Sequence, residues 1–315
     1  MMEEIFENYK RELSIYLSGC KADEIIKTDI DCALNKIGIY YRIFSRTKSA
    51  YSTSMKLIEK EKKYIERGKG MQDIIGVRIV LYYQDDISIV QNILTDKYRM
   101  LKDDSEIDIP KASEFKPIRR NLVFELPDEA VDIIQQEVWE KFYIEKTFEV
   151  QIRTIFSEGW YEVEHDIRYK HDKEWENPEY YVYNRGLNRI NATLETCDTE
   201  IVREISDLAY DCYKNGKVIE MLRYKFRIRL EKEELSEQLM EYIQNNSEFF
   251  KKLYRVERSK ILRCYTLIHN CKSLNNLVYL SNELEIHDNN VTDMAGADRV
   301  KRLRSAIKEF ENTIK

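Results

Sequence analysis

The sequence predicts an α+β or α/β fold that is followed by an all-helical C-terminal region. Short runs rich in isoleucine and valine, which are typical of buried strands, alternate with segments whose apolar residues recur every three or four positions, as in amphipathic helices. Beyond the pair Asn215-Gly216, which is a turn signal, only the helical pattern continues. We therefore expect a first domain over residues 1–215 and a helical domain over residues 216–315.

Helical patterns dominate the start of the chain. Residues 3–18 and 21–44 carry apolar side chains at helical spacing. Residues 52–67 do so again, and Gly68 and Gly70 then break the pattern. We expect these segments to form helices that cover a sheet.

The strand pattern then appears three times, and each strand is followed by a helical pattern. The expected strand and helix pairs are 74–83 with 87–94, 122–126 with 129–142, and 147–152 with 155–169. The helical segments expected after them are 184–213, 218–243, 248–262, 266–284 and 295–314.

The composition is that of an ordinary globular protein of 315 residues, 43% of them hydrophobic. Its 57 acidic and 51 basic residues give a net charge of -6, so the chain as a whole does not attract polyanions, and any polyanion site has to be local. Residues 1–10 are charged rather than apolar, and no stretch approaches the roughly 20 apolar residues that span a bilayer. The sequence therefore indicates a cytoplasmic protein with no membrane partner.

Cysteine and histidine argue against several kinds of site. The six cysteines form no C-x-x-C pair, so neither a zinc ribbon nor a disulfide framework is indicated. The four histidines are too few, and too scattered, to supply the ligands of a metal-dependent His-Asp phosphohydrolase.

The first motif that carries chemistry is a cluster of cations near the expected start of a helix. It reads Arg46-x-Lys48-x-x-x-Ser52, and Lys56 follows one helical turn later. Cations and a hydroxyl in this arrangement offer charge-assisted hydrogen bonds to a polyphosphate. Taken alone, the motif is more typical of a solvated basic helix.

Two further motifs place polar side chains on expected strands. Asp73 directly precedes a hydrophobic strand that contains Arg78, a rigid position for a magnesium ligand. Glu149, Gln151 and Arg153 alternate along another strand and therefore share one of its faces. If the two strands are neighbours, the two carboxylates can share one Mg²⁺, with Glu149 placed to accept a proton from an attacking hydroxyl. A carboxylate that merely ends a loop and a solvent-facing strand are the simpler alternatives.

The fourth motif is rich in ionisable residues and falls on an expected helix. Glu162, His165, Asp166 and Tyr169 lie at spacings that bring them close together on the helix surface. An exposed helix with no role in a site would show the same pattern, with Trp160 and Val163 on its buried side.

Taken together, the four motifs resemble the synthetase motifs of the RelA/SpoT family of alarmone synthetases, the GTP pyrophosphokinases, in identity, order and approximate separation. The resemblance covers about residues 36–170. It implies a mixed β-sheet, nucleotidyltransferase-like synthetase domain flanked by helices. It also implies Mg²⁺-dependent transfer of pyrophosphate from ATP to the ribose 3′-hydroxyl of GDP or GTP, making (p)ppGpp. No histidine-aspartate hydrolase domain is recognisable before this region, so the expected type is a small, synthetase-only member.

The resemblance assigns roles residue by residue. The positions matching the family's ATP-binding motifs are Arg46, Lys48, Ser52, Lys56 and Arg78. The positions matching its two catalytic, metal-binding carboxylates are Asp73 and Glu149. The acceptor side and its supporting helix correspond to Gln151, Arg153 and His165.

One loop departs from the family pattern. The family reads Pro-Lys-x-Asn-Gly-Tyr-x-Ser-x-His there and stacks the tyrosine on the guanine of the acceptor. This chain keeps Lys111 and an aromatic ring at Phe115, but Pro117 replaces the serine and Arg119 the histidine. We expect Lys111, Phe115 and Arg119 to bind the acceptor.

Because of this departure, two alternatives stay open beside GDP or GTP as the acceptor. One is pyrophosphorylation of the tRNA 3′ end, as in the toxic members of the family, since the added cations of the loop suit phosphates. The other is a catalytically silent nucleotide-binding regulator. Whether the chain forms a homo-oligomer, and what its helical C-terminal region does, are also left open by the sequence.

Overall fold

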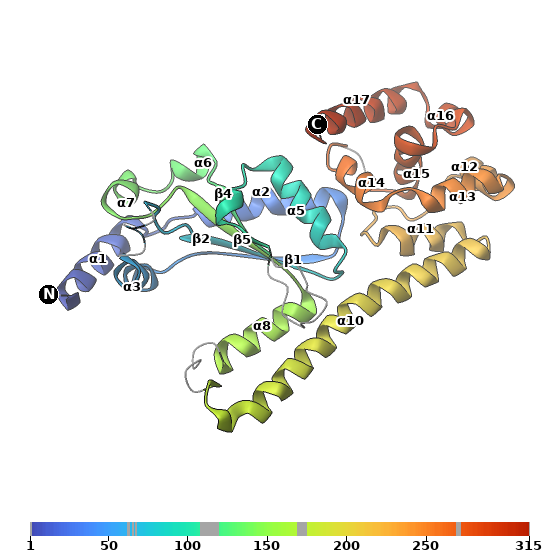
Figure 1. Ribbon diagram of the computed structural model, residues 1–315. Coiled ribbons are helices and arrows are strands. Elements are labelled where there is room, and N and C mark those ends of the chain that lie inside the picture. The colour runs from blue at the N-terminus through green and yellow to red at the C-terminus, as the bar shows by residue number, and fades with distance from the viewer. Residues whose placement is uncertain are drawn as a thin grey trace. The chain divides into compact units, whose positions relative to one another are not determined.

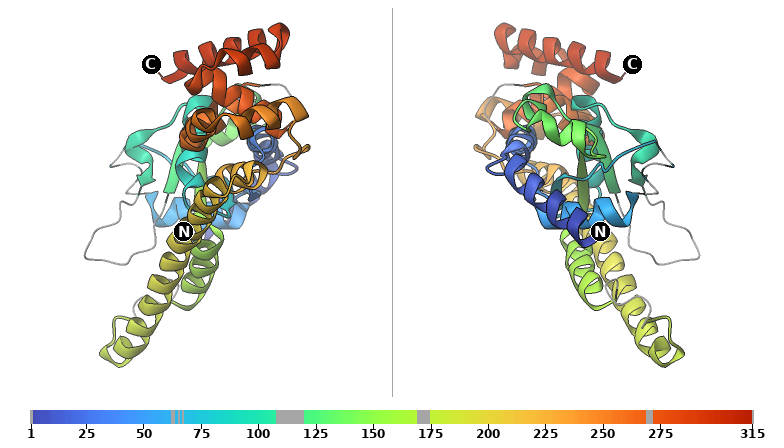
Figure 2. Two further views of the ribbon diagram at one scale, coloured as in Figure 1. Left: turned by 90° about the vertical axis from the view of Figure 1, so that its right-hand side faces the viewer. Right: turned by 90° about the vertical axis from the view of Figure 1, so that its left-hand side faces the viewer.

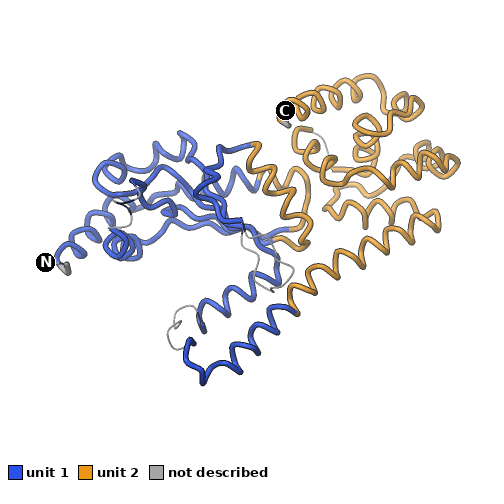
Figure 3. The backbone as a smooth tube through the Cα atoms, viewed as in Figure 1, with its two compact units in different colours: residues 1–31, 41–80, 97–192 blue, residues 32–40, 81–96, 193–315 orange. Residues whose placement is uncertain are grey.

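The chain folds into two compact units. A computed structural model describes residues 2–61, 64, 66, 68–107, 120–168, 175–268 and 272–314. Unit 1 consists of residues 1–31, 41–80 and 97–192, and unit 2 of residues 32–40, 81–96 and 193–315 (Figure 3). Unit 1 carries the sheet, and unit 2 is built mainly of helices. The predicted fold class, a mixed sheet flanked by helices with a helical region after it, is confirmed.

The sheet of unit 1 has five strands in the described part of the chain, in the order β1-β2-β5-β4-β3. They are β1 (Tyr41–Thr47), β2 (Ile75–Leu81), β3 (Glu106–Ile107), β4 (Arg120–Glu125) and β5 (Thr147–Thr154) (Figure 1). β4 is antiparallel to both β3 and β5. Met71 pairs in parallel with Ile144, just before β2 and β5 begin. β5 is therefore the central strand, with β2 on one side and β4 on the other.

The helices of unit 1 fall in the expected segments, with bounds that differ. They are α1 (Met2–Tyr16), the first part of α2 (Ala22–Ile37), α3 (Ala50–Glu59), α6 (Asp128–Val131), α7 (Gln136–Lys141), α8 (Ile155–Ile167) and the first part of α10 (Tyr181–Lys214). Short 3-10 helices span Lys102–Asp104 and Pro178–Tyr180. In both views of Figure 2, α8 lies beside the start of α10, and Arg168 donates a 3.1 Å hydrogen bond to Asn188 there.

Unit 2 contains α5 (Asp86–Lys97), the remainders of α2 and α10, and a series of short helices. These are α11 (Val218–Phe226), α12 (Glu237–Asn245), α13 (Ser247–Arg255), α14 (Arg258–Tyr265), α15 (Leu274–Ser281), a π-helical turn (Asn282–Ile286), α16 (Asn289–Ala295) and α17 (Ala297–Ile314). The turn expected at Asn215-Gly216 is present, with Gly216 at a φ of 69°. The domain boundary expected there stays a prediction. No helix among the described residues is long and apolar enough to span a membrane.

One predicted helix was wrong at its end, because it ran through a strand. Residues 41–44, expected at the end of a helix, belong to β1. Gly38 ends α2 with a φ of 83°, a conformation that favours glycine, and side chains of β1 then alternate between more buried and exposed positions. The short apolar pattern of this strand was hidden because it directly follows the helical one.

Three other predicted helices are broken. The helix expected over residues 248–262 is divided between α13, which ends at Arg255, and α14, which begins at Arg258. The helix expected over residues 129–142 is two short helices, α6 and α7. Ala130, Ile134 and Val138 are all buried, and since they are four residues apart they also fit one continuous helix, so the break left no signal. The helix expected over residues 218–243 ends at Phe226, because Arg227 takes a left-handed backbone with a φ of 48°.

The core of unit 1 is centred on aromatic rings behind β5. Phe124 and Phe148 stack with their ring centroids 5.4 Å apart, and Tyr98 packs edge-on against Phe148 at 5.2 Å. The Tyr98 hydroxyl donates to the Asp29 carboxylate. Phe148, Val150 and Ile152 thus point into the core, and the alternate residues of β5 are left for the opposite face.

In unit 2, an ion-pair cluster holds the start of α5 against other helices. Asp86 is fully buried and pairs with Arg258 of α14 at 2.6 Å. Asp85 beside it accepts from Arg227 and Arg258. Burial raises the pKa of Asp86, and the Arg258 guanidinium opposes this effect. A buried carboxylate of this kind is stable only with its cation in place.

Removing the central aromatic ring of unit 1 should test this core. We expect Phe148→Ala to lower the free energy of unfolding by about 3–5 kcal/mol, since it leaves a cavity against Phe124 and Tyr98. Tyr181→Ala is the control, because Tyr181 is 64% exposed and its loss should change stability by about 0.5 kcal/mol or less. Urea unfolding followed by circular dichroism measures both, and equal losses for the two variants would contradict this description of the core.

Candidate active site

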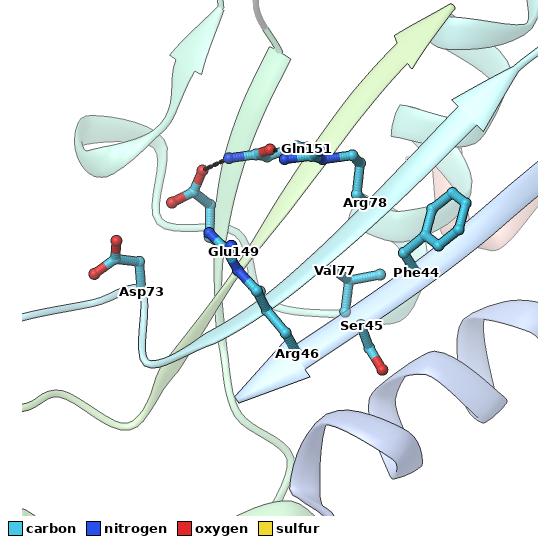
Figure 4. A pocket seen from close by; sticks show the side chains of 9 residues that line it. Phe44, Ser45, Arg46, Asp73, Val77, Arg78, Glu149 and Gln151 are labelled. Carbon is cyan, nitrogen blue, oxygen red and sulfur yellow. Dashed lines mark hydrogen bonds between the residues drawn. The ribbon is translucent and has the colours of Figure 1, made fainter. Parts of the chain in front are cut away.

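A pocket of about 270 Å³ opens on the polar side of the sheet, where β1, β2 and β5 lie next to one another. Its lining residues are Phe44, Ser45, Arg46, Asp73, Gly76, Val77, Arg78, Glu149 and Gln151. Figure 4 shows the carboxylates of Asp73 and Glu149 at one end of the pocket and Phe44 at the other. Two acidic residues that are far apart in the sequence therefore share one pocket, as expected from β2 and β5 being neighbours.

The Asp73 carboxylate is held by two ammonium groups. Oδ2 accepts from Lys48 Nζ at 2.8 Å and from Lys56 Nζ at 2.6 Å. Lys48 follows β1 directly, and its backbone N–H donates to Ile74 O, which fixes the end of β1 beside the start of β2. Lys56 comes from α3, whose first turn is capped by the Ser49 side chain. The other oxygen, Asp73 Oδ1, is buried without a hydrogen-bond partner in the described part of the chain.

Burial and charge act in opposite directions on this cluster. Burial alone would raise the pKa of Asp73, but Lys48 and Lys56 outweigh it, so the pKa lies below its ordinary value and the carboxylate is ionised at neutral pH. Burial lowers the pKa of Lys48 in spite of Asp73. Burial, together with the Asp73 charge, raises the pKa of the nearby Tyr64 hydroxyl to about 12. The cluster thus presents an ionised carboxylate with two cations bound to one of its oxygens.

The second carboxylate is oriented by an amide. Gln151 Nε2 donates to Glu149 Oε1 at 2.9 Å, and Gln151 Oε1 accepts from Arg78 Nε at 3.3 Å and from Arg153 Nη2 at 3.2 Å. The period of two along β5 places Glu149, Gln151 and Arg153 on one face, as predicted. Gln151 therefore links the Glu149 carboxylate to two guanidinium groups.

The start of α8 holds these guanidinium groups in turn. Arg78 Nη1 donates to Glu158 at 2.7 Å and to Glu162 at 2.5 Å, and Arg153 donates to Glu158 at 3.2 Å. Arg153 also lies over the Tyr161 ring, 3.9 Å from its centroid. Burial lowers the pKa of Arg78, but its two carboxylates outweigh it, so the pKa is raised and the charge is retained.

Most of the residues predicted for the site are brought together, and some are not. Arg46, Arg78 and Gln151 line the pocket with the two carboxylates, and Lys48 and Lys56 bind Asp73. Ser52 is exposed in the first turn of α3, where its N–H donates to Ser49 Oγ.

The other predicted acceptor residues lie elsewhere. Arg153 is two residues beyond Gln151, the last residue of β5 that lines the pocket, and it donates a hydrogen bond to the Gln151 side chain. His165 is exposed on α8, 3.2 Å from Asp166, and is not among the residues that line the pocket. Lys111, Phe115 and Arg119 fall outside the described residues.

The sequence interpretation missed Phe44 and Ser45. The Phe44 ring is 53% exposed and lines the pocket, and Ser45 donates to Asp23 at 2.8 Å. Phe44 was assigned to the end of a helix over residues 21–44, and Ser45 was assigned to no element. The alternation of Arg42, Phe44 and Arg46 was the available signal, since these residues occupy the exposed positions of β1.

The pocket has the donor set for a hard divalent cation that is also bound by a phosphate. No group of three or more histidine, cysteine or acidic side chains that would hold a metal occurs in the described residues. Mg²⁺ takes one or two protein carboxylates and completes its shell with phosphate oxygens and water. Asp73 Oδ1, which is buried and unbonded within the described chain, and the Glu149 carboxylate fit this requirement.

Comparison with known proteins identifies similar sequences over this region. A family model described as a region found in RelA/SpoT proteins matches residues 45–174. GTP pyrophosphokinase YwaC of Bacillus subtilis (strain 168) is 30% identical over 176 residues, which are 54% of this chain and 79% of that protein. The span that the family model matches contains all of the residues that line the pocket except Phe44.

Similar solved structures include two synthetases from the same organism. The crystal structure of small alarmone synthetase 1 from Bacillus subtilis bound to its product pppGpp has a TM-score of 0.47 and 23% identity, over 64% of this chain and 99% of that one. The crystal structure of small alarmone synthetase 2 has a TM-score of 0.45 and 25% identity, over 62% of this chain and 96% of that one.

Replacing Asp73 by asparagine should destabilise the fold at neutral pH, because Lys48 and Lys56 lose the carboxylate that they share. We expect a loss on the order of 1–3 kcal/mol in the free energy of unfolding at about pH 7. Since the folded pKa of Asp73 lies below its ordinary value of 3.8, the wild-type advantage is complete above that value and is lost as the pH falls through the folded pKa. Urea unfolding of both proteins, from neutral to acid pH, measures the difference. A difference that grows toward acid pH would contradict the charge assignment.

Proposed function

The chain belongs to the RelA/SpoT family, and we propose that it is an ATP-dependent pyrophosphokinase that pyrophosphorylates the ribose 3′-hydroxyl of GDP or GTP, making (p)ppGpp. The relative YwaC, named a GTP pyrophosphokinase, supports this proposal because the match spans 79% of that protein. The observation that carries it is the single pocket lined by Asp73, Glu149 and Arg46. Paired carboxylates beside cations suit phosphoryl transfer, whose catalysis is mostly positioning and charge stabilisation.

The proposed reaction is an in-line displacement at the β-phosphorus of ATP. The acceptor's 3′-oxygen forms a bond to this phosphorus, the bond from it to the oxygen bridging the α-phosphate breaks, and AMP leaves. The hydroxyl proton passes to Glu149, whose Oε1 is held by Gln151 and whose carboxylate lines the pocket. Arg46, Lys48 and Lys56 bind the triphosphate oxygens, on which negative charge accumulates in the transition state.

Asp73 and Glu149 are the residues that we propose to hold Mg²⁺. Bound there with ATP, the ion would neutralise phosphate charge and orient the β-phosphorus. Binding of the ion would also change what the two lysines contact. In the described structure both bind Asp73 Oδ2, so a cation on Asp73 would weaken their hold and free the ammonium groups for the triphosphate. Ser52 and Arg78 complete the proposed ATP side.

On the acceptor side, we assign Gln151 and Arg153 to the ordering of the catalytic face of β5. Both belong to the hydrogen-bonded chain that begins at Glu149. Lys111, Phe115, Arg119 and His165 remain proposed acceptor contacts on the basis of the family resemblance alone.

The proposed activity predicts a labelled product from ATP and a guanosine nucleotide. With ATP labelled in its terminal phosphates and Mg²⁺ present, GDP or GTP should gain the label and AMP should appear. Asp73→Asn and Glu149→Gln should each lower kcat by about 100-fold or more, since each removes a charge on which the transition state depends. Circular dichroism establishes that each variant is folded.

Two further outcomes of the same assay discriminate between the alternatives. Transfer of label to deacylated tRNA, with none to GDP or GTP, would replace the proposed acceptor by the tRNA 3′ end. Tight nucleotide binding without transfer to any acceptor would leave a silent regulator. Full activity of the Asp73→Asn variant would refute the metal assignment.

Phe44 should contribute a stacking surface for the adenine of ATP, because its ring is exposed at the end of the pocket opposite the carboxylates. Loss of a stacked base typically costs about 1–3 kcal/mol. We therefore expect Phe44→Ala to raise the KM for ATP by about fivefold or more with little change in kcat, and Phe44→Tyr to behave like the wild type. Steady-state kinetics with varied ATP measures this, and a fall in kcat at unchanged KM would contradict it.

A further inference from the structure

We infer that Gln72, Glu145 and Thr147 are positioning residues that set the separation of the Asp73 and Glu149 carboxylates. This inference rests on the proposed function, since it concerns a cation shared by these two residues. The three residues lie outside the pocket lining and outside the roles assigned from the family resemblance. They join the chain just before β2 to the start of β5 and the residues before it.

The side chain of Gln72 binds two carboxylates at once. Its Nε2 donates to Glu145 Oε2 at 2.8 Å and to Asp104 Oδ2 at 3.0 Å. An amide nitrogen has two hydrogens to donate, so both are used. Lys69 also donates to Asp104 at 2.9 Å, which offsets one of the two negative charges of this group. Gln72 is thus held on both sides, at the position directly before Asp73.

The main chain of the same segment is bound to β5. Thr147 Oγ1 donates to Gln72 O at 2.9 Å, and Thr147 is 3% exposed. The Met71 N–H donates to Tyr143 O at 2.6 Å, and the Glu145 N–H donates to Met71 O at 2.9 Å. A short stretch of chain is therefore fixed through both its side chains and its backbone.

The two segments are in such close contact that one position excludes a side chain. A Cβ atom at Gly70 would lie 2.6 Å from Tyr143 O and 2.7 Å from Tyr143 C, closer than such atoms pack. The Gly70 N–H donates to Glu145 Oε1 at 2.8 Å. Since Gln72 donates to Oε2, both oxygens of Glu145 accept hydrogen bonds across this junction. Backbone groups that meet this closely leave little freedom for either segment to shift.

The junction lies close to both carboxylates along the chain. Asp73 is one residue from Gln72, and Glu149 is two residues from Thr147 on the same strand. The hydrogen bond from Thr147 to Gln72 therefore joins the two backbone segments that carry the carboxylates, close to both of them. Outer residues that orient metal ligands typically change metal affinity by about 10- to 100-fold when they are replaced.

The test measures the affinity of Mn²⁺, a spin-active substitute for Mg²⁺, by electron paramagnetic resonance in the presence of a non-hydrolysable ATP analogue. Thr147→Val keeps the shape of the side chain and removes only the hydroxyl, and Gln72→Met removes the amide. We expect each to raise the Kd for Mn²⁺ by about 10-fold. Thr147→Ser retains the hydroxyl and should restore the wild-type Kd.

A matched control separates positioning from loss of stability. Thr53 of α3 is fully buried, and its hydroxyl has no hydrogen-bond partner among the described residues. Thr53→Val should therefore leave the Kd for Mn²⁺ unchanged. Thermal unfolding of every variant shows which are folded, and a structural role alone would lower stability without shifting the Kd of the folded protein.

The outcomes distinguish this inference from the proposed function. An unchanged Kd in folded Thr147→Val and Gln72→Met would overturn the inference, while product formation by the wild type would leave the proposed function standing. A raised Kd in both variants, rescued in Thr147→Ser, would support the inference even if the wild type transferred no label to a guanosine nucleotide. Absence of Mn²⁺ binding by the wild type with the nucleotide analogue would overturn it as well.

Discussion

The ion cluster at Asp73 is the interaction on which the site depends. A half-buried carboxylate is costly unless cations approach it closely, and Lys48 and Lys56 do so from two different elements. Lys48 directly follows β1 and Lys56 lies in α3, so the cluster holds the end of β1 and helix α3 against the start of β2. The same charges that stabilise the protein without nucleotide are the ones that a triphosphate and its metal ion would use. Under the proposed function, the two lysines would exchange the Asp73 carboxylate for the triphosphate.

β5 connects this cluster to the rest of the fold. Its buried residues, among them Phe148 and Val150, form the core of unit 1, while Glu149 and Gln151 face the pocket. Because the side-chain period of a strand is two, the packing of one face determines the position of the other. A shift in register that exposed Phe148 would also bury Glu149, so the stability of the core protects the geometry of the site.

Much of this arrangement was predictable from the sequence, and what was missed has physical reasons. The strand that follows Asp73 and the strand that carries Glu149 were predicted because their apolar runs are short and rich in β-branched residues. Their adjacency followed only from the family resemblance, since pairing between distant strands leaves no local signal. Phe44 was missed because β1 directly follows a helix whose apolar pattern runs into it. The junction of Gln72 with Glu145 and Thr147 was out of reach, because it depends on two segments meeting across the sheet.

The central claim is that Asp73 and Glu149 bind one divalent cation together with ATP. Calorimetric titration of the wild type, Asp73→Asn and Glu149→Gln with a non-hydrolysable ATP analogue, with and without Mg²⁺, tests it most directly. The account predicts that Mg²⁺ tightens nucleotide binding by the wild type and that this gain is lost in both variants. Retention of the full Mg²⁺-dependent gain in either variant would contradict it.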